Sequence, residues 1–276
     1  MAYFCKPIEG LSMTGKITFI RKYLNHYFQA RSKYDLHSPF IYKLYRDVLK
    51  DHRQYPQYRM LDNLRRRLSE DNHFLSRVDL GANGMDFPRQ KKLVTVRHIV
   101  RRSSVSPRIG ELLFRLSQYF QPGFILELGT SVGLSTAYLK AGWPECNVLT
   151  IEGSQEVADE ARRNFNLLGF AGIIQRTGNF DDLLPGILAE SPSPDLVFID
   201  GNHRKEATLN YFNQILQHIK PSSVIIFDDI HWSDGMQEAW KEIRRNQKVR
   251  VSVDLFSVGI LFFREELSKE DFIIRF

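Results

Sequence analysis

The pattern of apolar and polar positions changes character near residue 106 of this 276-residue chain. Before that point, apolar and aromatic residues recur every three or four positions, which is typical of amphipathic helices. This spacing predicts two helices within residues 16–50, separated at His37-Ser38-Pro39, because Ser38 can cap a helix whose first turn accepts Pro39. Further predicted elements are helices over 57–70, 91–102 and 107–120 and a Gly- and Asn-rich loop over 78–90.

From Gly123 onward, short apolar runs alternate with amphipathic segments. Predicted strands occupy the apolar runs 124–129, 147–153, 172–178, 195–201 and 223–229. Predicted helices between and after them cover 133–141, 154–168, 181–189, 205–219 and 234–245. Such an alternation favours a parallel sheet with helices on both faces, and near-continuous apolar strands fit a sheet that is buried on both sides.

The end of the chain departs from this alternation. The apolar runs 249–256 and 258–264 are joined by almost nothing, so they are predicted to be antiparallel neighbours. The predicted fold class is therefore α/β, with a mostly parallel, seven-stranded, Rossmann-like sheet that ends in an antiparallel hairpin. Residues 1–105 are predicted to form a helical extension and residues 106–276 the α/β domain.

Charge divides the chain at nearly the same place. Residues 1–110 carry a net charge of +13, and the remaining residues carry −7. The basic part could meet an anionic partner such as nucleic acid, a phosphorylated metabolite or a membrane surface, or it could be a solvated helical surface.

Composition narrows the class of protein. The chain is 43% hydrophobic and 25% charged, which is typical of a soluble globular protein. Its two cysteines, Cys5 and Cys146, exclude a disulfide framework and a Cys-rich zinc site. Neither a long apolar run nor a secretion signal is visible, so we expect no membrane span and a cytoplasmic location.

The turn after the first strand carries the first candidate ligand contacts: Glu127, Gly129, Thr130, Ser131 and Gly133. Ligands bind at this edge of open α/β sheets. The G-x-x-x-G spacing departs from the G-x-G-x-x-G fingerprint of nicotinamide-binding proteins, so a dehydrogenase is disfavoured. The Glu127 carboxylate suits a ligand with an amino group better than a pyrophosphate. The alternative is a tight strand-to-helix turn that binds nothing.

Two further strand ends carry candidate contacts. Glu152 ends the second strand, where an acid can accept hydrogen bonds from ribose hydroxyls, and Gly153 follows it. Gly178-Asn179-Phe180 ends the third strand, and an amide beside an aromatic ring can bind the edge and the face of adenine. The alternatives are a surface glutamate and a turn followed by a core phenylalanine.

Acidic and imidazole side chains follow the fourth and fifth strands. Asp200 and His203 come after the fourth strand, and Asp228, Asp229 and His231 come after the fifth. Adjacent strands bring these ends together, and clustered carboxylates need a cation or raised pKa values. Asp200, Asp228 and Asp229 therefore form a candidate site for Mg²⁺ or another divalent cation, unless Asp228 or Asp229 caps the next segment.

A histidine beside an acid suggests acid–base chemistry. The ordinary pKa of histidine, about 6.5, makes His203 the candidate general base and Asp200 its catalytic partner. His231 is a second candidate for that role. Trp232 could line a substrate pocket, whereas Trp240 is predicted to pack in the core.

Together these residues resemble the class I S-adenosylmethionine-dependent methyltransferases of the catechol and caffeoyl-CoA O-methyltransferase-like branch, over about residues 106–264. The segment LELGTSVGLST matches the first motif of that branch. The resemblance implies that Glu127 contacts the methionine end of the cofactor and that Glu152 holds its ribose. The candidate cofactor contacts are Glu127, Gly129, Thr130, Ser131, Gly133, Glu152, Gly153, Gly178, Asn179, Phe180 and Asp200.

The same resemblance implies that Asp200, Asp228 and Asp229 occupy metal positions of the branch. The third position is usually Asn in the branch, and His203 stands where the branch has a catalytic Lys. These differences concern the mechanism rather than the fold. The segments FIDGNH and FDDIHW, and an N-terminal extension of about 100 residues, resemble bacterial members of the branch.

The sequence therefore predicts methyl transfer from S-adenosylmethionine to an oxygen of a small-molecule acceptor, including anionic acceptors. A divalent cation would assist, and His203 would remove the proton. An RNA or protein acceptor is the alternative, supported by the basic residues 1–110 and opposed by the absence of an Asn-Pro-Pro-Tyr motif. A non-catalytic cofactor-binding module is a third hypothesis. A homodimer is compatible with all of these.

Overall fold

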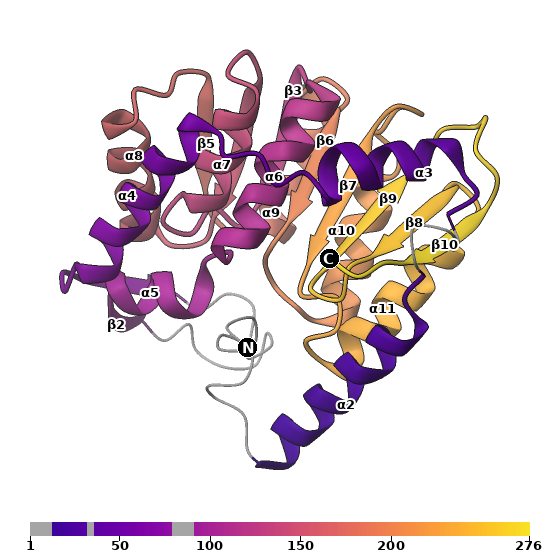
Figure 1. Cartoon of the computed structure of the whole chain (residues 1–276). Helices are drawn as coiled ribbons and strands as arrows, with labels where there is room; N and C mark the ends of the chain where they lie inside the picture. The colour runs from indigo at the N-terminus through magenta and orange to yellow at the C-terminus, as the bar shows by residue number, and fades with distance from the viewer. Residues whose placement is uncertain (1–12, 32–35, 79–90) are drawn as a thin grey trace.

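The computed structural model describes residues 13–31, 36–78 and 91–276 (Figure 1). In this part of the chain the main sheet has eight strands in the order β10-β8-β9-β7-β6-β3-β4-β5. The strands are β3 (Phe124–Leu128), β4 (Asn147–Glu152), β5 (Ile173–Thr177), β6 (Leu196–Ile199), β7 (Val224–Asp228), β8 (Val251–Asp254), β9 (Val258–Phe262) and β10 (Glu270–Ile273).

The predicted parallel sheet and its closing hairpin are confirmed. Strands β5, β4, β3, β6 and β7 pair in parallel, and β9 runs antiparallel to both β7 and β8. The expected seven strands are corrected to eight, because β10 adds a parallel partner to β8. This edge strand has only four residues, Glu270–Ile273, and too short an apolar stretch to stand out in the sequence.

Alternate residues of each strand face opposite layers of helices, as the pleat requires. In β3, Ile125 packs into the core beneath α6 and α7, whereas Leu126 and Leu128 pack beneath α9, α10 and α11 (Figure 1). The helices of the two layers are α6 (Pro107–Phe120), α7 (Leu134–Gly142), α9 (Phe180–Glu190), α10 (Lys205–Ile215) and α11 (Asp234–Arg245). Helix α8 (Gln155–Leu167) follows β4.

The N-terminal part combines helices with a small hairpin. Its elements are α2 (Met13–Gln29), α3 (Pro39–Leu44), a π-helical turn η3 (Tyr45–Leu49), α4 (Pro56–Glu70), β1 (Phe74–Val78), β2 (Lys91–Thr95) and α5 (Val96–Ser103). The expected cap is present, because the Ser38 hydroxyl accepts a hydrogen bond from the Ile41 amide. The helix predicted over 91–102 is wrong for residues 91–95, which pair antiparallel with β1. Residues 79–90 of the predicted loop lie outside the described residues.

The extension shares its core with the α/β domain. Ile41, Leu44 and Leu61 are fully buried in the same cluster as Leu112 and Phe114 of α6. The boundary between residues 105 and 106 therefore stays a prediction.

Helix α2 packs beside α11, joined by an ion pair of 2.7 Å between Lys22 and Asp234 (Figure 1). Its other side leaves apolar residues largely exposed, among them Met13, Ile17 and Leu24. The homodimer stays a prediction. Across the described residues, no helix is both long enough and apolar enough to cross a bilayer.

Candidate active site

The carboxyl ends of β3, β4, β6 and β7 meet at one edge of the sheet, as the sequence predicted. The Gly129 and Thr130 amides donate to the Ile151 carbonyl, at 3.0 and 3.1 Å, and tie the turn after β3 to β4. On the other side, the Asp200 amide donates to the Leu128 carbonyl at 2.8 Å. These backbone bonds bring the side chains that follow the strands to the same edge of the sheet.

Glu127 is the most deeply buried carboxylate at this edge, with no exposed surface. Its Oε2 accepts hydrogen bonds from the hydroxyls of Thr136 and Thr150, the latter at 2.6 Å. Burial raises the pKa of Glu127 to about 7, although these hydroxyl bonds favour its charged form. Within the described residues, Oε1 has no partner, and such a group costs free energy unless a donor reaches it. A ligand amino group could supply that donor.

The glycines of the turn are required by its backbone and its neighbours. Gly129 has φ +108°, and a Cβ there would lie 2.1 Å from the Asp200 carbonyl oxygen. Gly133 has φ +85°, and its Cβ would lie 2.6 Å from the Phe165 ring. These contacts fix the turn without a ligand, so contact of either glycine with a cofactor stays a prediction. Between them, the buried Ser131 hydroxyl has no partner among the described residues.

The Thr130 hydroxyl forms a hydrogen bond with the Thr150 hydroxyl, at 2.5 Å. Glu152 is held by the same turn: its Oε2 accepts from the Ser131 amide at 2.8 Å and its Oε1 from the Ser154 amide at 3.1 Å. Burial raises the pKa of Glu152 above its ordinary value, because its effect exceeds the opposing effect of these amide bonds. The carboxylate is thus oriented and half-buried, with lone pairs left for ribose hydroxyls.

Asn179 and Phe180 begin α9, beside the end of β5. The Asn179 side-chain oxygen caps the helix by accepting from the Asp181 amide at 3.3 Å. The Phe180 ring lies edge-on to Tyr211, with centroids 5.8 Å apart, and a Cβ at Gly201 would lie 2.7 Å from the Phe180 ring. Gly178 has φ +154° and donates its amide to the Glu152 carbonyl at 2.9 Å. Among the described residues, the side-chain nitrogen of Asn179 has no hydrogen-bond partner.

His203 lies beside Asp200, with 3.5 Å between Nε2 and Oδ1. Burial opposes its charged form, but the hydrogen bond to Asp200 and the charges of Asp229, Asp200 and Asp228 outweigh burial and raise the pKa of His203 to about 9. The ordinary value near 6.5 therefore does not carry over to this site, which favours the protonated form of His203 at neutral pH. Burial and the charges of Asp229 and Asp200 also hold the pKa of Asp228 well above its usual range.

The carboxylates do not form a metal site as they are placed here. In the described part of the chain, no three His, Cys, Asp or Glu side chains are grouped so that they could hold a metal ion. Asp200, Asp228 and Asp229 are close enough to influence one another's charge, yet the cation that they surround is His203. The divalent cation at Asp200, Asp228 and Asp229 therefore stays a prediction.

Asn202 is a site residue to which the sequence argument gave no role. Its φ of +51° lies in the left-handed region, which asparagine tolerates better than most residues. Its amide nitrogen donates to the Tyr211 hydroxyl at 2.9 Å, and its buried Oδ1 has no partner among the described residues. Its position directly before His203, just after a strand, is the sequence feature that could have indicated a role in the site.

His231 belongs to a buried cluster around Asp254, which sequence reasoning missed. The Asp254 carboxylate, 3% exposed, accepts from the His231, His26 and Trp240 side chains and the Phe256 amide, at 2.9, 3.0, 3.1 and 2.9 Å. The other ring nitrogen of His231 lies 2.8 Å from the Gln237 amide. Both ring nitrogens of His231 are therefore engaged by side chains of the protein. Trp240 is buried, as predicted.

Ser154 lies directly before α8, and its hydroxyl donates to the Ser76 carbonyl at 2.7 Å. Trp232 is exposed, and its role as a pocket wall stays a prediction.

Comparison with known proteins agrees with this geometry. A family model described as a methyltransferase domain matches residues 126–230. A catechol O-methyltransferase of Niastella koreensis is 35% identical over 130 residues, which cover 46% of this chain and 58% of that protein. A catechol O-methyltransferase of Mycobacterium tuberculosis is 34% identical over 137 residues, which cover 49% of this chain and 60% of that protein. The chain thus spans less than two thirds of the length of either relative.

Solved structures agree as well. A cofactor-bound protein from MTB has a TM-score of 0.52 at 26% identity, over 60% of this chain and 84% of that chain. An O-methyltransferase from Bacillus cereus in complex with SAH has a TM-score of 0.53 at 23% identity, over 81% of this chain and 97% of that chain. At this identity the similarity concerns the fold alone. Over residues 126–230 the chain is therefore similar to methyltransferase domains, and over about half of its length it is similar to two catechol O-methyltransferases.

Proposed function

We propose that the protein transfers the methyl group of S-adenosylmethionine to an oxygen of a small-molecule acceptor. The observation that carries the proposal is the buried Glu127 carboxylate, whose Oε1 has no partner in the part of the chain that the structure describes, at the edge where four strands end. An amino-acid moiety such as that of S-adenosylmethionine provides the missing donor. The names of the relatives, catechol O-methyltransferases, support an oxygen acceptor.

The remaining site residues take roles that their geometry permits. Glu152, oriented by two backbone amides, accepts the ribose hydroxyls. Asn179 and Phe180 lie near the adenine, and the Ser131 hydroxyl adds a polar contact. Thr130 contributes only its backbone, since its hydroxyl is engaged with Thr150.

The chemistry is an in-line displacement at the methyl carbon. The carbon–oxygen bond to the acceptor forms as the carbon–sulfur bond breaks, giving S-adenosylhomocysteine, the methyl ether and a proton. Alignment of the two reactants is the main task of the protein. His203 takes the proton of the acceptor hydroxyl once it has lost its own, and Asp200 positions the ring. A small anionic acceptor would lie beside the protonated His203.

Calorimetric titration with S-adenosylhomocysteine tests the cofactor, in EDTA and again in Mg²⁺. We expect micromolar binding by the wild type and at least tenfold weaker binding by Glu127→Gln, because the charged partner of the amino group is lost. Glu145→Gln, at an exposed loop position, is the matched control. A folded wild-type sample that binds nothing in either solution would refute the proposal. Binding that requires Mg²⁺ would restore the carboxylate metal site to the mechanism.

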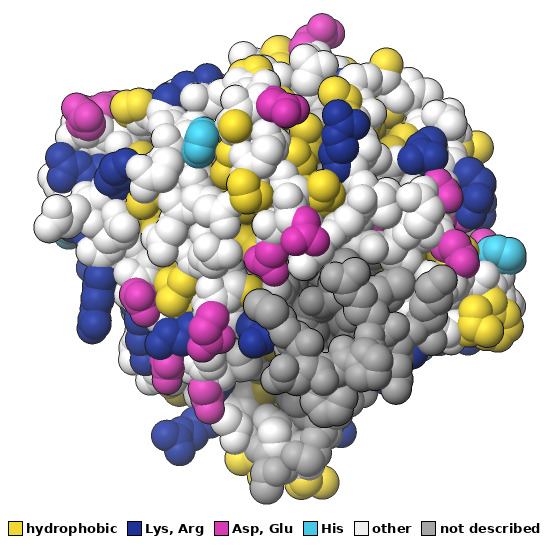
Figure 2. All heavy atoms as spheres, turned by 180° about the vertical axis from the view of Figure 1, so that it is seen from behind, with side chains coloured by type: hydrophobic (Ala, Val, Ile, Leu, Met, Phe, Trp, Pro, Cys, Tyr) yellow, Lys and Arg dark blue, Asp and Glu magenta, His cyan; other side chains and the backbone are white. Residues whose placement is uncertain are grey.

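An RNA or protein acceptor has less support. Its basis is the net charge of residues 1–110. On the face shown in Figure 2, lysine and arginine side chains alternate with aspartate and glutamate rather than forming one basic surface. The proposal therefore keeps a small acceptor. Methylation of bulk RNA by the purified protein, and of no small phenol or catechol, would reverse this preference.

A further inference from the structure

A basic pocket lies at the opposite edge of the sheet from the candidate active site. It is formed where β7 and β8 begin and β9 ends, by the segments 216–221, 245–250 and 263–269. Its volume is about 730 Å³. We call it the amino-edge pocket. Its charged lining residues are Lys220, Arg245, Lys248, Arg250, Lys269 and Glu265.

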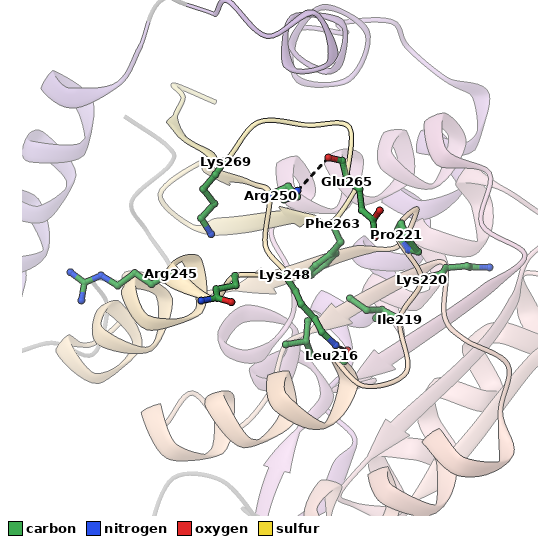
Figure 3. A pocket seen from close by; sticks show the side chains of 11 residues that line it. Leu216, Ile219, Lys220, Pro221, Arg245, Lys248, Arg250, Phe263, Glu265 and Lys269 are labelled. Atoms are coloured by element: carbon green, nitrogen blue, oxygen red, sulfur yellow. Dashed lines mark hydrogen bonds between the residues drawn. The ribbon is translucent and has the colours of Figure 1, made fainter.

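This concentration of positive charge is unexpected from composition, because residues 111–276 carry a net charge of −7. Five cations and one carboxylate give the pocket lining a net charge of +4. Figure 3 shows Lys269 and Arg250 on one side of Phe263 and Lys220 on the other, with Arg245 extending outward from α11. A solvated surface normally intersperses the two signs of charge.

The cations of the pocket have few anionic partners. Lys220 forms an ion pair of 2.5 Å with Asp195. By contrast, the hydrogen bonds of Lys248 and Arg250 to other described residues go to backbone carbonyls at 3.4 Å, and Lys269 donates to three carbonyls beside the end of α11. Within the described residues, Arg245 has no ion pair. Burial lowers the pKa of Lys269, and the charges of Arg250 and Arg244 act in the same direction, whereas the nearby Asp271 carboxylate opposes them.

Size and lining indicate the class of ligand. A volume of about 730 Å³ falls within the roughly 300–1,000 Å³ of small-molecule sites. Leu216, Ile219 and Phe263 provide apolar wall beside the cations. Several phosphates in a row carry a negative charge comparable with the +4 of the lining, and Arg and Lys bind phosphate through charge-assisted hydrogen bonds. We propose that the amino-edge pocket binds an oligophosphate group, free or carried by a small molecule, at a site separate from the methyl-donor site.

The separation follows from the sheet itself. Pro221 of the pocket precedes β7, whereas Asp228 of the candidate active site ends it. Five residues of strand span about 13 Å between the first and last Cα, at about 3.3 Å per step. The proposal does not depend on the proposed methyltransferase activity, and the test below is run both with and without S-adenosylhomocysteine.

The test is calorimetric titration of the full chain with sodium tripolyphosphate and with ATP. We expect both probes to bind, equally with and without saturating S-adenosylhomocysteine. In the double variant R245Q/K248Q, binding is expected to weaken about 100-fold, or about tenfold for each removed cation. Both residues are exposed, so the fold should be retained, and the melting temperature checks this. The double variant K241Q/R176Q removes two exposed cations elsewhere and should bind like the wild type.

Three results would overturn the proposal: no binding by the folded wild type, unchanged binding by R245Q/K248Q, or competition between tripolyphosphate and S-adenosylhomocysteine. The two probes also distinguish the sources of the phosphate. Binding of ATP at least tenfold tighter than tripolyphosphate assigns a nucleotide whose base meets the apolar wall, whereas equal binding assigns inorganic oligophosphate. A single-stranded oligonucleotide that displaces tripolyphosphate and binds tenfold tighter would replace the small ligand with a nucleic acid.

Discussion

Replacing Asp200 by Asn should lower the pKa of His203. Burial disfavours the imidazolium form, and Asp200 opposes burial with both a hydrogen bond and a negative charge. The pKa of about 9 against the ordinary 6.5 corresponds to about 3 kcal/mol, at 1.36 kcal/mol per pKa unit. Asn removes the charge while burial persists, so we expect the pKa of His203 to fall by about 1–2 units, as for loss of a close opposite charge.

NMR titration of ¹³C-labelled histidine measures this pKa directly, with the His203→Gln spectrum assigning the signal. The rate provides a second measurement. If deprotonated His203 is the base, kcat/KM rises about tenfold per pH unit below pH 9 and then levels off. In Asp200→Asn the level region should begin at lower pH. Asp159→Asn, an exposed carboxylate paired with Arg162, is the control and should leave the pKa of His203 unchanged.

Two results would refute this reasoning. A wild-type His203 pKa near 6.5 would mean that the carboxylates do not act on it as the structure indicates. A rate that falls above pH 9, with the measured pKa of His203 still near 9, would mean that the imidazolium form is the active one. His203 would then bind the acceptor oxygen as a hydrogen-bond donor instead of removing its proton.

Three further predictions concern stability. Asp254→Asn should lower the free energy of unfolding by about 3–5 kcal/mol in urea denaturation, because four donors lose their buried carboxylate; a loss under about 1 kcal/mol would contradict this. Gly142→Ala should cost about 1–3 kcal/mol or more, since its Cβ would lie 2.2 Å from the Phe114 carbonyl oxygen. Gly186→Ala, in open space within α9, should instead stabilise by up to about 1 kcal/mol, and equal effects of the two would count against the packing argument. Finally, the raised pKa of His203 contributes stability that is fully present below about pH 6.5 and lost as the pH rises through about 9; denaturation across this range should show no such loss in His203→Gln.

The parts of the fold that the sequence predicted are those set by local pattern. Apolar runs such as 195–201 and 223–229 are long enough to identify a buried strand, and their alternation with helices determines the parallel order. The same reasoning placed Asp200 and Asp228 at one edge. The N-terminal hairpin was missed because residues 91–95 precede a basic helix without a break signal in the sequence. Strand β10 was missed because its four residues are held in place by β8 rather than by their own pattern.

The parts that sequence reasoning missed depend on distant contacts. His26 and Asp254 are 228 positions apart, and no local spacing relates them. The pKa of His203 likewise depends on several contributions added together. Spacing predicted the neighbouring Asp200, but the value of the pKa also depends on burial and on the charges of Asp228 and Asp229. The metal site stays a prediction for a related reason: spacing brings three carboxylates to one edge, but among the described residues they do not converge on one point.

Charge in the α/β domain is segregated between the two edges of the sheet, which the average of −7 for residues 111–276 conceals. The partly exposed Glu152, Asp200 and Asp229 lie at the carboxyl edge, whereas Lys248 and Lys269 lie at the amino edge. The edges are about one strand length, or about 13 Å, apart, which exceeds the roughly 8 Å Debye length at physiological ionic strength. Each edge therefore presents its own charge to solvent. A sulfonium cofactor is attracted to one edge and an oligophosphate to the other, so neither net charge nor its division along the chain identifies the ligands of this domain.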